Sequence, residues 1–155
     1  MSKVFKQEVD TKEQRPGGPL LITLLFKQSV DLPEIQRIAE VCRKHIGNVE
    51  CRKDDDKSLF IFALDHIAKF QDGEAPVQLL LTSCANFDGK TVDDFTRSQM
   101  WNCQESHDRI LEECRYSMLA TDFLAGGLLS LERANLEMDF LAALAELFPS
   151  CEAFF

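Results

Sequence analysis

The chain of 155 residues lacks the motifs that identify a function directly. It contains no CxxC pair, GxGxxG loop, GxxxxGK[ST] loop or GxSxG elbow, and therefore no complete metal, nucleotide or nucleophile motif. Its apolar stretches, such as residues 20–26, fall far short of the roughly 20 residues that span a bilayer. Residues 1–15 alternate charges and lack the apolar core of a signal peptide. We therefore expect a soluble, cytoplasmic protein.

Basic residues are scarce after the first third of the chain. Residues 54–155 carry seven Lys or Arg against nineteen Asp or Glu, whereas residues 1–53 carry ten against seven, and the net charge is −9. An acidic surface repels phosphate groups, so we expect neither nucleic acid nor an anionic membrane as a partner. The acidity is most simply a solubility feature, with a basic protein partner as the alternative.

Cysteine is present six times, but without the spacing of a disulfide framework or a secretory signal. We expect reduced thiols. Cys103, His107 and Cys114 would share one helix face, yet only one close pair exists, whereas zinc takes four ligands. Core packing is the favoured interpretation, because cysteine often fills apolar interiors. Residues 54–56 lack the ligand alternation of a calcium loop. We expect no metal and no other cofactor.

Short apolar stretches alternate with helical patterns along the chain. We expect strands over residues 20–26, 49–53, 58–64, 77–82, 116–121 and 151–155, and helices over residues 31–46, 92–115 and 130–148. Asp31 is the expected cap of the first helix, and the second helix is interrupted near Trp101. This order predicts an α/β fold, with α+β as the alternative, in which about three helices pack on one mixed sheet of five or six strands.

The expected domain boundaries follow from breakers and from the end of the chain. Residues 1–18 are expected to be a flexible leader that ends in a Pro-Gly-Gly cluster, and residues 19–155 a single domain. The chain stops on Phe154 and Phe155 without a polar tail. We expect either an incomplete C-terminus or a partner that covers this end.

The most informative stretch joins the strand at residues 116–121 to the last helix. Thr121, Asp122, Gly126 and Gly127 would lie at a strand-to-helix turn, where α/β proteins often bind ligands. The glycine pair could admit a phosphate to the helix N-terminus, although a tight connection is the favoured role. For Asp122 we favour a structural carboxylate that accepts hydrogen bonds from the turn, with ligand binding as the alternative.

A catalytic site can be assembled from the same region only on one condition. If the strands at residues 77–82 and 116–121 are parallel, then Ser83, His107 and Asp122 could form a nucleophile, base and orienting group, with Trp101 as a pocket wall. The favoured interpretation is that such residues make local hydrogen bonds in turns.

Residues 95–154 carry a resemblance to a known family. The segments at residues 95–103, 114–116, 120–128, 132–134 and 147–153 resemble an uncharacterised bacterial domain-of-unknown-function family. The resemblance implies a sheet that continues beyond the last cysteine-containing strand. It implies no activity, so no catalytic residue is carried over.

Our preferred function is a small cytoplasmic binding or regulatory module that acts through a protein partner or a homo-oligomer. Enzyme motifs are missing, while apolar residues remain at the C-terminus and on the last helix, which carries two apolar stripes. The alternative is a small-molecule enzyme of hydrolase or transferase type, with a site between residues 83–86 and Thr121-Asp122.

Overall fold

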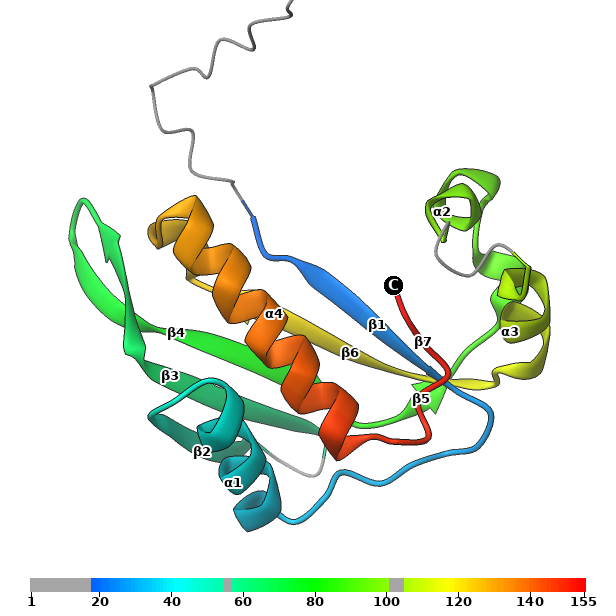
Figure 1. The fold of residues 1–155 in the computed structure, drawn as a ribbon, viewed down its shortest axis with the longest axis horizontal. Coiled ribbons are helices and arrows are strands. Elements are labelled where there is room, and N and C mark those ends of the chain that lie inside the picture. The colour runs from blue at the N-terminus through cyan, green and yellow to red at the C-terminus, as the bar shows by residue number, and fades with distance from the viewer. Residues whose placement is uncertain (1–17, 55–56, 101–104) are drawn as a thin grey trace, which may run out of the picture.

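The computed structural model describes residues 18–54, 57–100 and 105–155. These residues form a seven-stranded sheet in the order β2-β3-β4-β6-β1-β7, with β5 also paired to β6 (Figure 1). The strands are β1 (Leu21–Phe26), β2 (Val49–Asp54), β3 (Ser58–Phe70), β4 (Gly73–Thr82), β5 (Ala85–Asn86), β6 (Tyr116–Phe123) and β7 (Ala153–Phe154). The helices are α1 (Ile35–His45), α2 (Asp94–Gln99), α3 (His107–Glu113) and α4 (Ser130–Leu147). The predicted order of strands and helices is confirmed except that the structure adds the short strand β5 and has two helices, α2 and α3, in place of one.

The sheet differs from the prediction because all of its pairings are antiparallel rather than mixed. It has seven strands instead of five or six, and the described residues form four helices instead of three. Strands β1 and β2 run in the same direction and are joined through α1, yet β6, β4 and β3 lie between them. Strands β6 and β7 are likewise joined through α4 and separated by β1. The alternation of strand and helix patterns therefore does not make consecutive strands parallel neighbours.

The bounds of several helices and strands also differ from the predicted ones. The first helix begins at Ile35, about one turn later than the Asp31 cap predicts, and its N-cap residue Glu34 makes no side-chain cap hydrogen bond. Residues 65–76 lie between the strands predicted at 58–64 and 77–82, yet most of them are strand. Strands β3 and β4 extend into a long hairpin, with a register shift between Ala63 and Ile67. The second predicted helix is divided into α2 and α3.

One face of the sheet packs against α1 and α4, which both lie on the viewer's side of it in Figure 1. Strand alternation places apolar side chains on this face, and the largest buried ones are Phe26 of β1, Phe140 of α4 and Phe148, which directly follows α4. Buried members of this core include Leu24, Ile38, Val41, Leu59, Ile61, Leu79, Met118, Leu136, Phe140 and Phe148. Within the described residues, no helix is both long and apolar enough to cross a membrane.

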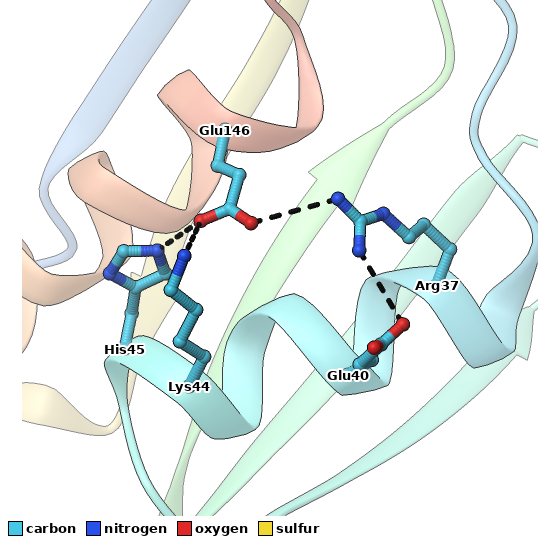
Figure 2. Close-up of polar contacts among 5 residues, drawn as sticks. All are labelled: Arg37, Glu40, Lys44, His45 and Glu146. Carbon is cyan, nitrogen blue, oxygen red and sulfur yellow. Dashed lines mark hydrogen bonds and ion pairs between the residues drawn. The ribbon is translucent and has the colours of Figure 1, made fainter.

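The two helices are joined by an ion cluster around Glu146 of α4 (Figure 2). The Nζ of Lys44 and the Nε2 of His45 lie 2.8 and 2.7 Å from Oε2 of Glu146, and Nη2 of Arg37 lies 3.6 Å from Oε1. The hydrogen bonds with Lys44 and His45 lower the pKa of the Glu146 carboxyl to about 2. The cluster therefore ties the last turn of α1 to the last turn of α4.

The opposite face of the sheet is covered at one end by a second apolar cluster. Leu25 of β1 packs there with Met100 and with Ile110, Leu111 and Cys114 from α3 and its C-terminus. Further along this face, the strands carry half-buried apolar side chains, among them Phe60, Phe62, Leu80 and Leu119.

Candidate functional site

The predicted turn after β6 leads into a buried charged cluster beneath α4. Asp122 near the end of β6 is only 1% exposed, and Arg133 and Glu137, one helical turn apart on α4, are 8% and 7% exposed. Burial of three ionisable side chains in one place is costly unless they are paired and hydrogen-bonded. The contacts of each therefore decide what the cluster can do.

Asp122 is fully engaged in contacts within the protein. Nε of Arg133 donates to Oδ2 at 2.8 Å, Nη2 of Arg133 donates to Oδ1 at 3.0 Å, and the backbone N–H of Leu20 donates to Oδ1 at 2.6 Å. Burial alone would raise the pKa of this carboxyl, but the interactions with Glu137, Arg133 and Leu20 outweigh it and hold the pKa below 3.8. These contacts support the structural role that the sequence favours for Asp122.

The same cluster fixes the chain where it enters β1. The hydroxyl of Thr121 donates to the carbonyl of Leu20 at 2.7 Å, and Nη2 of Arg133 donates to the carbonyl of Gly18 at 2.9 Å. Residues 18–20 are therefore held against β6 and α4 by side chains from both elements.

Glu137 differs from its neighbours because no described N–H or O–H group donates to its buried carboxyl oxygens, and its hydrogen-bonding neighbour is the Asp122 carboxyl. Burial, followed by the hydrogen bond with Asp122 and by the negative charge of Asp122, raises the pKa of the Glu137 carboxyl to about 8. Two ionised carboxylates have no proton with which to form a hydrogen bond, whereas a protonated Glu137 can donate to Asp122. At neutral pH, Glu137 is therefore mainly neutral.

A groove of about 520 Å³ lies over this cluster, between α4 and the segment that leads into β1. Glu137 and Arg133 contribute to its lining, and its other walls are mainly apolar. Those apolar walls are Pro19, Leu20, Ala134, Met138 and Leu141. An apolar groove with a small number of polar groups is the usual form of a binding site.

Gly127 has a packing role, which agrees with the tight connection that the sequence favours over phosphate binding. A side chain at Gly127 would meet Cβ of Ala68 at 2.8 Å and the backbone nitrogen of Lys69 at 2.9 Å, so its backbone lies directly against β3. Gly126 and Asp122 line a separate hollow of about 220 Å³. Thr121 and Asp122 thus lie within the last residues of β6, and the two glycines lie in the short 3-10 turn that follows it, at residues Ala125–Gly127.

Ser83 and Asp122 lie apart because β4 and β6 are antiparallel, so the condition for a shared catalytic site is not met. Asp122 pairs with Leu79, and Ser83 is four residues further along the chain, about 13 Å away at the rise of a strand. Ser83 instead lines a hollow of about 280 Å³ with Asp31 and Lys53.

His107 is the first residue of α3, which precedes the N-terminal end of β6, whereas Asp122 lies near the C-terminal end of that strand. The Nδ1 atom of His107 lies 3.0 Å from Oδ1 of Asp108. Trp101 and Cys103 lie outside the described residues. A charged cavity of about 730 Å³ beside α3 is lined by Arg97 and Asp108, which form an ion pair at 3.1 Å. Among the described residues, none of the predicted site residues lines this cavity.

The cysteines of the described segments are unpaired. Burial raises the pKa of the Cys42 thiol to about 12 and that of Cys151 to about 11, which disfavours the reactive thiolate. In the same segments, no three His, Cys, Asp or Glu side chains are grouped so that they could hold a metal ion.

Sequence reasoning missed Arg133 and Glu137. The available signal was their spacing of four residues on a helix whose neighbouring positions are apolar. This spacing is equally typical of an exposed ion pair, so it does not by itself indicate burial.

Comparisons with protein-family models, with curated proteins and with solved structures found no match. The resemblance of residues 95–154 to a domain-of-unknown-function family therefore stays a prediction.

Proposed function

We propose that this protein is a small cytoplasmic binding module that acts through contact with another protein, and that the groove beside α4 is its contact surface. The observation that supports this proposal is the unequal burial of the two apolar stripes of α4. Leu136, Phe140 and Ala143 are buried against the sheet, whereas Ala134 and Met138 are exposed and Leu141 is half-buried.

The exposed apolar side chains of α4 have an exposed apolar neighbour across the groove. Met138 is 64% exposed, and Leu20, across the groove from it, is 44% exposed. Exposed apolar side chains that form a continuous surface are typical of interaction sites, whereas single ones are ordinary. A methionine at the centre suits such a surface, because its flexible side chain adapts to the shape of a partner.

The proposal is tested by placing a charge in the groove. Met138→Lys should abolish co-purification of a partner from the native cells, because the lysine would have to be buried in an apolar contact. Asn135→Lys adds the same charge at an exposed position of α4 that does not line the groove, and should leave the partner bound.

Light scattering at several concentrations would show whether the partner is a second copy of the chain. Self-association that Met138→Lys removes would identify a homo-oligomer. A partner that remains bound to Met138→Lys, or a monomer that recovers no partner at all, would contradict the proposal.

A further inference from the structure

Residues 18–20 form an exposed wall of the groove that is attached through the charged cluster. All three residues are exposed, whereas Arg133 and Glu137, which line the groove from α4, are buried. The backbone of Leu20 is hydrogen-bonded to two side chains of β6, and the carbonyl of Gly18 accepts from Arg133. Gly18 has a φ of +78°, in the left-handed region that glycine adopts freely, so the chain can turn at this residue.

A single proton completes the charged cluster that holds this wall. Asp122 accepts three N–H groups, one from Leu20 and two from Arg133, and these donors favour its ionised form. A hydrogen bond between two carboxyl groups requires a proton on one of them. Because Asp122 is held ionised, the proton belongs to Glu137, which donates it to Asp122. The cluster is then electrically neutral, with one carboxylate, one guanidinium and one carboxylic acid.

Loss of this proton leaves one negative charge in a buried place. Among the described residues, Asp122 from β6 and Arg133 from α4 are the charged groups that act on Glu137, and residues 18–20 carry no charged side chain. An ionised Glu137 loses its hydrogen bond to Asp122 and is repelled by it. Since a buried charge without a partner is costly, the ionised state favours an arrangement that admits water or moves a cation.

We propose that residues 18–20 are a pH-sensitive strap over the groove, which is closed while Glu137 is protonated and released when Glu137 ionises. The inference concerns the regulation of the contact surface and rests on the proposed function. Arg133 lies one helical turn before Glu137, so its guanidinium can turn toward a second carboxylate by giving up the carbonyl of Gly18. The strap is the part of the site that moves at least cost, because β6 and α4 are packed in the core.

Release of the strap would remove one wall of the groove. Pro19 and Leu20 line the groove together with Met138 and Leu141 of α4, so a partner would meet the complete apolar surface only in the closed form. No covalent bond changes other than the loss of the proton, which passes from Glu137 to solvent.

The test measures hydrogen exchange of two backbone amides in the free protein by NMR. The N–H of Leu20 is bonded to Asp122 and should open with the strap, whereas Ile22 lies within the pairing of β1 with β6 and is the internal control. Glu137→Gln has a neutral side chain that can still donate to Asp122, so its strap should stay closed at every pH. Comparison of the two proteins at the same pH cancels the ordinary increase of exchange with pH.

The expected result follows from the two states of Glu137. Its pKa is about 8 in the closed form and 4.5 ordinarily, so opening should increase with pH up to about 8 and become constant above it. Between pH 6 and pH 8, opening at Leu20 relative to Glu137→Gln should rise at least about tenfold, with about 100-fold as the limit for a fully solvated Glu137. Ile22 should exchange alike in both proteins. In the parent alone, the ratio of the Leu20 rate to the Ile22 rate should rise in the same way, which needs no variant.

Equal exchange of Leu20 in the two proteins over this range would overturn the inference. Parallel changes at Leu20 and Ile22 would also overturn it, because they would indicate opening of β1 as a whole. The measurement needs no partner, so its outcome is independent of the proposed function. A strap without pH dependence, in a protein whose partner is lost in Met138→Lys, would contradict the inference alone. A pH-dependent strap in a protein that binds no partner would contradict the proposed function alone.

Discussion

Arg133 of α4 contacts both carboxylate oxygens of Asp122 on β6, through Nε at 2.8 Å and through Nη2 at 3.0 Å. This two-point contact joins the last helix to the middle of the sheet. Because Arg133 also binds the carbonyl of Gly18 and Asp122 binds the N–H of Leu20, the pair fixes one wall of the groove as well. The stability of the fold and the shape of the proposed contact surface therefore depend on the same ion pair.

Asp122→Asn should lower the free energy of unfolding by about 3 kcal/mol, because it leaves the buried Arg133 guanidinium without its partner charge. Urea unfolding of the variant and its parent measures this difference. Asp139→Asn is the matched control: Asp139 is exposed on α4, and its change should stay within about 0.5 kcal/mol. An unaltered stability of Asp122→Asn would show that Asp122 has no structural role.

Glu137 should make the protein less stable in alkaline solution. Its pKa is about 8 in the folded protein and 4.5 ordinarily, so its contribution is fully present below pH 4.5 and is lost as the pH rises through 8. Glu137→Gln removes this titration. The free energy of unfolding of the parent, relative to that of Glu137→Gln, should therefore fall between about pH 5 and about pH 9. A constant difference over this range would refute the assignment.

Glu146 should make the protein less stable in acid, which is the opposite pH dependence to that of Glu137. Its pKa is lowered from 4.5 to about 2, so its contribution is present above pH 4.5 and is lost as the pH falls toward 2. Glu146→Gln should be less stable than its parent at neutral pH, and the two should converge in acid. Thermal unfolding at several pH values measures this convergence. Equal stabilities at neutral pH would show that the cluster in Figure 2 contributes nothing to the docking of α1 on α4.

Gly127→Ala should destabilise the protein by about 1–3 kcal/mol, as overpacking does. The added methyl group would lie 2.8 Å from Cβ of Ala68 and 2.9 Å from the backbone nitrogen of Lys69. Ser130→Ala, at an exposed position three residues later, should change the unfolding midpoint very little. Equal effects of the two substitutions would argue against close packing at Gly127.

The order of the elements could be predicted because each has a local signal. The last helix, for example, was expected to begin near Ser130 and does so. The position of each strand in the sheet has no such signal, since it depends on contacts between residues far apart in sequence. Ser83 and Asp122 each come directly after a strand pattern in the sequence. Because β4 and β6 are antiparallel, the two residues nevertheless lie apart in the structure.

The candidate site could be predicted only in part for the same reason. A polar residue at the end of a strand is visible in the sequence, and Asp122 was identified in this way. The burial of Glu137 depends on how α4 is oriented on the sheet and on where residues 18–20 pass. The two apolar stripes of α4 were recognised, but only the folded chain shows which of them stays exposed.

The groove beside α4 is the surface that we propose binds a partner. The most direct test compares the affinity of the natural partner for Met138→Lys with its affinity for Phe123→Lys. Phe123 is 38% exposed and belongs to the opposite face of the sheet by strand alternation, so the two variants place the same charge on two different surfaces. We expect Met138→Lys to weaken binding by at least about 100-fold, corresponding to the roughly 2.7 kcal/mol typical of an interface hot spot, and Phe123→Lys to leave it unchanged. Loss of binding in Phe123→Lys alone would contradict the account and assign the contact to the open face of the sheet.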